Sequence, residues 1–414
     1  MNDILPQDVH YWQILEKAAE QTFAAHGYEQ IRLPLLEKTE VFTRAIGTAT
    51  DVVSKEMYSF DDRNNESLSL RPEGTAGVVR AVLQNGLLYG AVTRLWYGGP
   101  MFRYERPQKG RSRQFHQLGA ELFGAAGPDA DAEILALGTH LWNRLGLDKL
   151  RLEINTLGNS EERRQYRDQL YAFLNTHRDK LDEQTNERAE RNPLRVLDSK
   201  DPQVQALLEE APLLSEQLGT DSRQHFEQLK RHLDQLEIEY HVNPRLVRGL
   251  DYYCHTVFEW ITSDLGAQGT VCAGGRYDNL VELQGGKPWP GIGFAMGEER
   301  LVELLKQKED IIPPVAHAYL VAVGENSTES ALELAYDLRA GIPQLRLLNN
   351  LNGGSFKAQF KRADRSGALL ALVLGEDEIR NNQVAIKFLR SGDEQLTLGR
   401  NDVGDWIRKY IDSI

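Results

Sequence analysis

The chain opens with apolar residues at helical spacing, and Gly27 is placed to end that helix. The apolar face consists of Trp12, Leu15, Ala19 and Phe23. A strand pattern follows over residues 28–36, with Ile31 and Leu33 in alternation up to Pro34. Because proline cannot donate to a sheet ladder, we expect this strand at a sheet edge or at a seam between two subunits.

Two strand-like runs, RLWYGGPMFRYE and RQFHQLGAELF, flank the basic loop RPQKGRS between residues 94 and 123. This arrangement predicts a long antiparallel hairpin. Alternation on its second strand gathers on one face Phe115, Gln117, Gly119, Glu121 and Phe123. A buried amide or carboxylate without a partner costs about 1–3 kcal/mol, so this face fits the lining of a ligand pocket better than a dry core. A strand face open to solvent is the alternative.

Residues 160–240 are more polar and carry helical patterns, which we interpret as a helical insertion. Ser160 can cap its first helix. The apolar face of that helix would be formed by Tyr166, Leu170, Phe173 and Leu174. A second helix is marked by Phe226, Leu229, Leu233 and Leu236.

Strand-like, glycine-rich sequence returns from 243 to 293, and the helix after it carries Leu301, Leu304 and Leu305. The charged run KQKEDIIPPVAH, with its pair of prolines, is the best linker candidate. Beyond it, AYLVAV and ALLALVL are short buried-strand runs between helical patterns, which indicates a small α/β domain with parallel strands. We therefore expect two domains, residues 1–312 and 317–414.

At 414 residues, 41% hydrophobic and 26% charged, the chain has the composition of a folded globular protein. No apolar run approaches the roughly 20 residues of a membrane-spanning helix, and the first residues lack the pattern of a targeting leader. Cys254 and Cys272 are the only cysteines, which argues against a disulfide framework and fits a cytoplasmic protein. The net charge of −13 disfavours nonspecific coating of nucleic acid but leaves a folded RNA partner open, because a local basic face can still dock on phosphate.

Three further segments combine residue types that are used in ligand sites. LRPEGT, residues 70–75, joins an acid, a glycine and a hydroxyl in a turn. LVRGLDYYCHTVFEW and then QGTVCAGGRYD place Arg248 ahead of paired tyrosines and of glycines that permit close backbone approach. GIGFAMGEERL leads into a helix with Arg300 near its first turn, where free backbone N–H groups suit phosphate. None of these is a Walker or Rossmann fingerprint, so a phosphate site would be built mainly from arginines.

Together these segments resemble class II aminoacyl-tRNA synthetases. FRYERPQKGRSRQFHQLGAELFG is similar to motif 2 of that class, GIGFAMGEERL to motif 3, and GYEQIRLPLLEKTEVF to motif 1, which builds the dimer interface. LVRGLDYY and AGGRYD resemble the two signature peptides of histidyl-tRNA synthetases. The resemblance covers nearly the whole chain. It implies an α+β protein in which an antiparallel-sheet catalytic domain, with a helical insertion at about 160–240, precedes a small α/β anticodon-binding domain.

The resemblance implies a histidine–tRNA ligase, which uses ATP to activate L-histidine as histidyl-adenylate and transfers it to the 3' end of tRNA(His). The implied histidine-binding residues are Glu73, Thr75, Arg103, Gln117, Glu121, Arg248, Tyr252, Tyr253 and Tyr277. Glu73, Thr75 and Gln117 would hold the α-amino group. Glu121 and Tyr253 would recognise the imidazole, and Tyr277 would close the pocket.

The same resemblance implies that Arg103, Arg248 and Arg300 are the catalytic residues. Arg103 and Arg248 would neutralise the substrate carboxylate and the α-phosphate of ATP, while Arg300 would contact the γ-phosphate. Arginine suits this task because its planar fork binds phosphate oxygens bidentately and keeps its charge. Further ATP contacts are implied for Glu105, Arg111 and Phe115, the last by stacking on adenine. Mg²⁺ is expected on ATP, held chiefly by the phosphates, with no tightly bound protein metal site.

In the basic loop, Arg106, Gln108 and Lys109 are expected to meet the acceptor end of tRNA, because a basic loop beside an ATP site has few other roles. A helix starting near Ser355 carries a basic face, for which a solvated surface and contact with RNA both stay open. The resemblance also implies a homodimer without membrane association.

Some residues are better interpreted as structural. Cys254 and His255 are adjacent, and neighbours on a strand point to opposite faces, so a shared thiol or metal site is not expected. His116 lies on the face opposite Gln117 and is interpreted as hairpin support rather than as an acid or base.

Two other classes of function were weighed. One is a synthetase-like regulatory subunit of histidine biosynthesis that senses histidine without catalysis, and the other is an amino-acid ligase that acts without tRNA. Neither has much use for an anticodon-binding domain. The three arginines also weigh against the regulatory subunit, because such relatives typically lose some of them.

Overall fold

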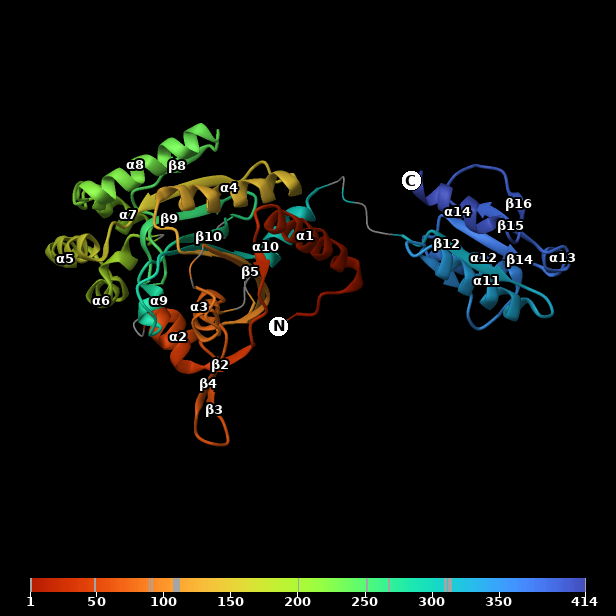
Figure 1. The fold of residues 1–414 in the computed structure, drawn as a ribbon, viewed down its shortest axis with the longest axis horizontal. Helices are drawn as coiled ribbons and strands as arrows, with labels where there is room; N and C mark the ends of the chain where they lie inside the picture. The colour runs from red at the N-terminus through yellow and green to blue at the C-terminus, as the bar shows by residue number, and fades with distance from the viewer. Residues whose placement is uncertain are drawn as a thin grey trace. The chain divides into compact units, whose positions relative to one another are not determined.

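The computed structural model describes residues 2–47, 50–88, 90, 92–106, 112–199, 201–250, 252–266, 269–308, 311 and 315–413. The chain divides into two compact units, Met1–Ile311 and Ile312–Ile414, and each is described by itself (Figure 1). Within these described ranges, no helix is both long and apolar enough to cross a membrane.

The first unit is built on an eight-stranded sheet with the order β1-β5-β6-β11-β10-β9-β7-β8. In chain order the strands are β1 (Glu29–Gln30), β5 (Thr93–Phe102), β6 (Gln114–Phe123), β7 (Arg151–Thr156), β8 (Tyr240–Val242), β9 (Cys254–Ile261), β10 (Thr270–Arg276) and β11 (Gly291–Gly297). Within this order, each strand pairs antiparallel with the next along the run β5, β6, β11, β10, β9 and β7, as expected. The edge strands β1 and β8 pair parallel, so the sheet is mixed rather than purely antiparallel.

The predicted hairpin is confirmed. β5 and β6 pair along their full length, from Thr93 opposite Phe123 to Phe102 opposite Gln114. The other edge of β6 pairs with β11, so this strand lies inside the sheet with a neighbour on each side. Side chains on either face of β6 are therefore flanked by residues of both neighbouring strands, β5 and β11.

The strand expected over residues 28–36 is wrong for most of its length. β1 ends at Gln30, and the chain next joins a separate three-stranded sheet of β2 (Leu36–Lys38), β4 (Ser67–Leu70) and β3 (Ser59–Asp61). In between, Arg71 donates from its side chain to the carbonyl of Leu33 at 3.0 Å and from its backbone to that of Leu35 at 2.9 Å. Because these carbonyls bond to Arg71 and Pro34 has no N–H, the segment does not extend the ladder.

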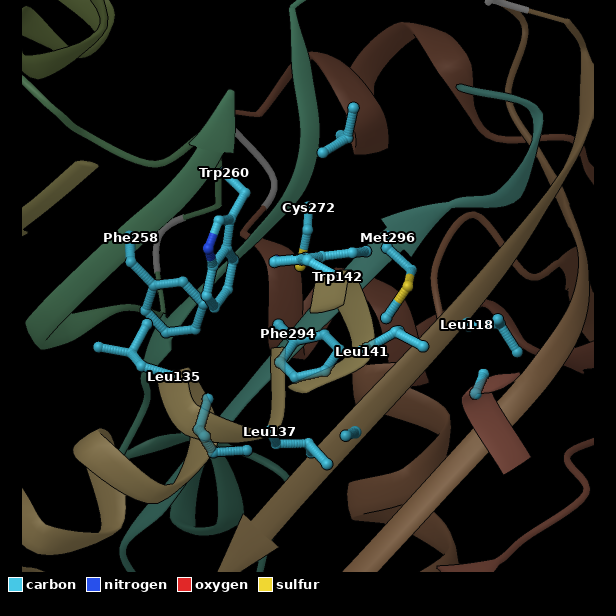
Figure 2. Packing of buried hydrophobic residues seen from close by; sticks show 14 of the residues in the cluster. Leu118, Leu135, Leu137, Leu141, Trp142, Phe258, Trp260, Cys272, Phe294 and Met296 are labelled. Atoms are coloured by element: carbon cyan, nitrogen blue, oxygen red, sulfur yellow. The ribbon is translucent and has the colours of Figure 1, made fainter. Parts of the chain in front are cut away.

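One apolar core of the first unit joins the large sheet to α1 (Pro6–Ala25), α4 (Pro128–Leu145), α8 (Thr220–Gln235) and α10 (Glu298–Leu305). The predicted apolar faces of α1 and α10 are buried in it. Figure 2 shows Trp142 of α4 beside Trp260 of β9, and their rings meet edge to face at 5.8 Å. These contacts hold the helices firmly against the sheet.

A second core contains residues of α2 (Thr39–Ile46), α3 (Thr75–Gln84), α5 (Ser160–Thr176), α6 (Glu183–Arg191), α7 (Pro202–Leu208) and α9 (Leu280–Leu283). Short π or 3₁₀ turns lie at Val52–Glu56, Arg178–Lys180, Pro193–Val196 and Leu214–Glu216. The helical character expected of residues 160–240 is confirmed, with two corrections. Asn159, not Ser160, caps α5, because its side chain accepts the backbone N–H of Glu161 and Glu162. Leu236 follows the end of α8 and is 52% exposed, so it does not belong to the apolar face.

The second unit has a five-stranded sheet of β13 (Leu347–Asn349), β12 (Ala318–Ala322), β14 (Leu370–Leu374), β15 (Gln383–Phe388) and β16 (Leu396–Gly399), in that order. Its helices are α11 (Ser327–Gly341), α12 (Phe356–Arg365), α13 (Glu376–Arg380) and α14 (Val403–Asp412). The predicted strands β12 and β14 are parallel neighbours, but β15 and β16 add antiparallel pairs. The small α/β unit is thus confirmed with a mixed sheet.

Candidate active site

A cavity of about 400 Å³ lies in the first unit, over the face of β6, β10 and β11. Eleven residues singled out in the sequence line it, namely Glu73, Thr75, Arg103, Glu105, Phe115, Gln117, Arg248, Tyr252, Tyr253, Tyr277 and Arg300. Glu121 is fully buried and bonds to the side chains of two of these residues. Arg106 is exposed and does not line the cavity, whereas Gln108, Lys109 and Arg111 lie outside the described residues.

The alternating face of β6 forms part of the cavity wall. Phe115 and Gln117 line the cavity, while Glu121 lies deeper, with no exposed surface. The alternative of a solvent-open strand face is therefore wrong. Within the described part of the chain, Gln117 Oε1 is buried without a hydrogen-bond partner, which leaves it available to a donor on a ligand.

Glu121 is surrounded by hydroxyl groups. Thr75 Oγ1 donates to Glu121 Oε1 at 2.7 Å, Tyr97 OH donates to the same oxygen at 3.4 Å, and Tyr277 OH donates to Oε2. Burial raises the pKa of Glu121 to about 8, with a further contribution from the nearby Glu73, and the hydroxyl bonds only partly oppose this. A carboxyl group in such a place is ready to accept an additional N–H donor.

The LRPEGT turn becomes the start of helix α3. Glu73 accepts the backbone N–H of Thr75 and of Ala76, both at 2.8 Å, and so caps the helix with a carboxylate. Burial raises the pKa of Glu73. The turn therefore places a second buried acid and the Thr75 hydroxyl in the same wall as Glu121.

Arginines form the other part of the wall. The Arg103 Nε donates to the carbonyl of Pro72 at 2.8 Å, and its guanidinium carbon lies 5.2 Å from the centre of the Phe115 ring. Arg103 is also 4.0 Å from Glu105, an ion pair that stays partly exposed. The guanidinium plane is thus held between backbone and ring, in an orientation suited to an anionic ligand.

Two further arginines share one support. Arg248 pairs with Glu259, and Glu259 accepts the hydroxyl of Thr270 at 2.9 Å. Arg300 donates to the backbone carbonyl of Thr270. Glu259 and Thr270 lie within two of the segments quoted from the sequence, but their residue types alone predicted no role for them. Only the pairing of β9 with β10 brings them together.

Tyrosines fill the space between the acids and the arginines. The rings of Tyr252 and Tyr253 are 4.6 Å apart, and Tyr277 meets Tyr252 edge to face at 5.8 Å. The guanidinium of Arg248 lies 5.8 Å from the ring of Tyr253. Burial raises the pKa of all three phenols, so they remain protonated and can donate hydrogen bonds.

Tyr97 is a residue that sequence reasoning missed. It lies on β5 opposite Gly119 of β6, and its hydroxyl reaches Glu121. A signal existed, because alternation from Arg103 back along the same strand places Tyr97 on a comparable face. Gly74 and Gly119, which pack against the Tyr97 ring, carry no side chain that would indicate this contact in the sequence.

His116, Cys254 and His255 lie in structural surroundings. The backbone N–H and the ring of His116 bond to Glu299 at 2.8 and 3.0 Å, and the ring packs against Trp12, in keeping with hairpin support. Burial raises the pKa of the Cys254 thiol to about 12, so it is not a thiolate nucleophile. His255 has a φ of 46° at an irregular start of β9, so strict alternation does not hold there. In the described part of the chain, no cluster of three or more His, Cys, Asp or Glu side chains suits a metal ion.

The cavity therefore combines a recess with two buried acids and several hydroxyls, suited to amine and N–H groups, with a wall of three arginines, suited to anions. A zwitterionic amino acid next to a polyphosphate has this distribution of charge. Comparison with known proteins agrees with that chemistry. Residues 1–301 match the family model described as histidyl-tRNA synthetase, and residues 317–410 match the model described as anticodon binding domain.

Solved structures extend the comparison. The chain is 33% identical to apo histidyl-tRNA synthetase from S. aureus, over 99% of this chain and 98% of that one, with a TM-score of 0.81. A histidyl-tRNA synthetase from Nostoc sp. is 20% identical over 99% and 98%, with a TM-score of 0.69. A protein from Bacillus halodurans, titled as an ATP phosphoribosyltransferase regulatory subunit/histidyl-tRNA synthetase, is 23% identical over 91% and 96%, with a TM-score of 0.64. The last two likenesses concern the fold alone.

Proposed function

Because the chain belongs to the histidyl-tRNA synthetase family, we propose that its cavity is the site where histidine is activated by ATP. The protein is a histidine–tRNA ligase with an anticodon-binding domain. The observation that carries the proposal for the site is the meeting, in one cavity, of the buried acids and of three arginines from distant parts of the sequence.

The recess around Glu121 takes the histidine side chain. Glu121 and the phenol of Tyr253 bind the two imidazole nitrogens, and Tyr252 and Tyr277 close the pocket around the ring. Glu73, Thr75 and the unpartnered carbonyl of Gln117 accept the α-ammonium group. Since Thr75 already donates its proton to Glu121, its oxygen lone pairs are left to accept from that ammonium group.

The arginine wall takes the charges that react. A carboxylate oxygen of histidine attacks the α-phosphorus of ATP, and the bond from that phosphorus to the bridging oxygen breaks, with pyrophosphate leaving. Arg103 and Arg248 neutralise the carboxylate and the α-phosphate, and Arg300 binds the γ-phosphate. Fixed guanidinium groups lower the barrier because negative charge builds up between two anions.

The nucleotide contacts extend along the same wall. Phe115 stacks on adenine beneath the Arg103 guanidinium, and Glu105 is a further ATP contact. Arg111 belongs to the same proposal from the sequence. Mg²⁺ bound with ATP would supply charge neutralisation, and the carboxylates of Glu105 and Glu299 in the cavity wall would hold it, because this ion prefers oxygen ligands.

In the second step a hydroxyl oxygen of the terminal ribose of tRNA(His) attacks the acyl carbon of histidyl-adenylate. The bond from that carbon to the phosphate oxygen breaks, and AMP leaves with the hydroxyl proton on its phosphate. Arg106, which is exposed, guides the acceptor end to the cavity, together with Gln108 and Lys109 as expected from the sequence. The chain further acts as a homodimer. Leu35 and Leu36, which follow Pro34, and Phe60 on β3 of the same small sheet are 40–50% exposed and offer apolar surface for a second copy. The cytoplasmic location stays a prediction from the sequence.

The regulatory-subunit alternative has less support. The relative whose title carries that name shares the fold at 23% identity over 91% of this chain, so the second unit alone does not separate the two classes. The three arginines in the cavity favour the ligase. No observation favours it specifically.

The test is histidine-dependent exchange of pyrophosphate into ATP, run beside charging of tRNA(His). Both activities are expected. Exchange without charging would contradict the assignment of the second unit, and histidine binding without exchange would move the protein to the regulatory class. Alanine at Arg248 should abolish exchange, while alanine at the exposed Arg44, outside the cavity, should not.

A further inference from the structure

Tyr97 is buried beneath the candidate site rather than in its lining. Its exposed fraction is 1%, and it lies on β5 directly opposite Gly119. A Cβ added at Gly74 would come within 2.1 Å of the Tyr97 ring, and one added at Gly119 within 2.3 Å. Both glycines therefore leave the space that this ring occupies, so the ring position is fixed by backbone from two separate segments.

The same tight packing continues at Glu121. A Cβ added at Gly293 on the neighbouring strand would lie 1.8 Å from Glu121 Oε2. Three glycines from three parts of the chain thus shape one compartment around Tyr97 and Glu121. Such close backbone contact on several sides leaves the two side chains little freedom to move.

The hydroxyl of Tyr97 is directed at the carboxylate. It donates to Oε1 at 3.4 Å, the oxygen that Thr75 also approaches, while Tyr277 donates to Oε2. Burial raises the pKa of the Tyr97 phenol well above its usual value, so the group stays protonated and remains a donor. Without Tyr97, the Thr75 hydroxyl would be the remaining hydroxyl that donates to Oε1. The same hydroxyl oxygen is also proposed to accept from the substrate ammonium group.

We propose that Tyr97 is a positioning residue for histidine recognition, whose ring and hydroxyl hold the Glu121 carboxylate in the orientation that receives the imidazole. This inference rests on the proposed role of Glu121. It predicts that Tyr97 affects binding of histidine and not of ATP, because its contacts are confined to the acid side of the cavity.

The first test is Tyr97→Phe, which removes the hydroxyl and keeps the ring between the glycines. The KM for histidine in pyrophosphate exchange should rise about tenfold, within the range for a buried polar group that loses a hydrogen-bond partner, while kcat and the KM for ATP change less than about twofold. Tyr28→Phe is the matched control. Tyr28 is 4% exposed, and within the described residues its hydroxyl has no hydrogen-bond partner. That variant should keep the wild-type constants.

The second test is a double-mutant cycle with Glu121→Gln. If Tyr97 acts through Glu121, Tyr97→Phe should add less than about twofold to the histidine KM in the Glu121→Gln background. Where turnover of those variants is too slow, the Kd for histidine from calorimetry replaces KM.

Three outcomes would overturn the proposal. They are a histidine KM in Tyr97→Phe equal to that of Tyr28→Phe, equal rises in the KM of both substrates, and full additivity in the cycle. The proposed role of Glu121 fails in a different way, because Glu121→Gln would then bind histidine like the wild type.

Discussion

Two buried carboxylates in the first unit differ in their partners. Glu121 on β6 and Asp131 on α4 both have no exposed surface. Burial acts to raise the pKa of each, but at Asp131 the charges of Arg276 and His225 outweigh it and lower the pKa to about 2, whereas at Glu121 the neutral hydroxyls do not, and the pKa rises to about 8. A buried acid that is paired with a cation stabilises the fold, and Asp131 with its hydrogen-bond partners is called the anchor below. A buried acid that is surrounded only by hydroxyls is a candidate ligand-binding group.

The anchor is saturated with hydrogen bonds. Asp131 accepts from Arg276 on one oxygen, and from Thr256 and the His225 ring on the other, the last at 2.7 Å. Arg276 in turn donates to the carbonyls of Ala125 at 3.0 Å and Gly127 at 2.9 Å. This network ties α4, β9, β10 and α8 together, next to the cavity but outside its lining.

The largest expected effect comes from removing the cation of the anchor. Arg276→Leu would leave Asp131 buried without its guanidinium partner, so the free energy of unfolding should fall by about 3–5 kcal/mol. Urea unfolding followed by tryptophan fluorescence measures it. Leucine at the exposed Arg144 is the control and should change stability by less than about 0.5 kcal/mol. A loss below about 1 kcal/mol in Arg276→Leu would mean that Asp131 is not an electrostatic anchor.

The second effect concerns function. Glu121→Gln keeps the shape of the recess but replaces an acceptor oxygen by an NH2 donor, so kcat/KM for histidine should fall about 5- to 150-fold, as for a buried polar group left without its partner. Stability near neutral pH should not fall, since a buried acid is replaced by a neutral amide. The two effects together distinguish the carboxylates. If Glu121→Gln unfolds the protein as Arg276→Leu does, the contrast between them is wrong.

The third effect is opposite pH dependence. Between about pH 4.5 and 8 the folded protein retains a proton on Glu121 that the unfolded chain releases, so this group makes stability fall as pH rises. Between about pH 3.8 and 2, Asp131 stays ionised in the folded protein, whereas the same group in the unfolded chain takes up a proton. Its contribution to the free energy of unfolding is therefore lost as the pH falls through this range.

As the pH rises from about 5 to 8, the free energy of unfolding should therefore fall less steeply in Glu121→Gln than in the wild type. The two slopes should differ by up to about 1 kcal/mol per pH unit. Urea midpoints at several pH values measure the slopes. The exposed Glu20→Gln should keep the wild-type slope. Parallel curves for Glu121→Gln and the wild type would contradict a raised pKa at Glu121.

The smallest expected effect is at the periphery of the anchor. His225→Ala removes one of the bonds to Asp131, while Arg276 and Thr256 remain, so the loss of stability should be about 1 kcal/mol. Thermal unfolding is sensitive enough to detect it. Gln228→Ala, at an exposed position on the same helix, should be near neutral. A loss as large as that of Arg276→Leu would make His225 the principal partner instead.

Local patterns were sufficient for elements whose geometry depends on nearby residues. The apolar spacing of α1, the hairpin of β5 and β6, and the parallel pair of β12 and β14 were all predicted and are present. The strand over 28–36 failed because the carbonyls of that segment bond to Arg71, far along the chain. Alternation alone could not anticipate a distant competitor for those hydrogen bonds.

The site shows the same division. Motif resemblance singled out eleven of the residues that line the cavity. It did not single out Glu259 and Thr270, which also line the cavity, or Tyr97, which lies beneath it; all three act through neighbours on adjacent strands. Their identities are ordinary for a strand. Their importance comes from what lies opposite them after the sheet has formed.

By itself, the sequence determined the periodic elements and the family to which the chain belongs. Only the tertiary structure decided what each buried acid does. Arg276 and Tyr277 are adjacent in the sequence, yet the first binds Asp131 and the second binds Glu121. The electrostatic state of a carboxylate depends on which groups lie within a few ångströms of it, and that proximity arises from chain segments more than a hundred residues apart.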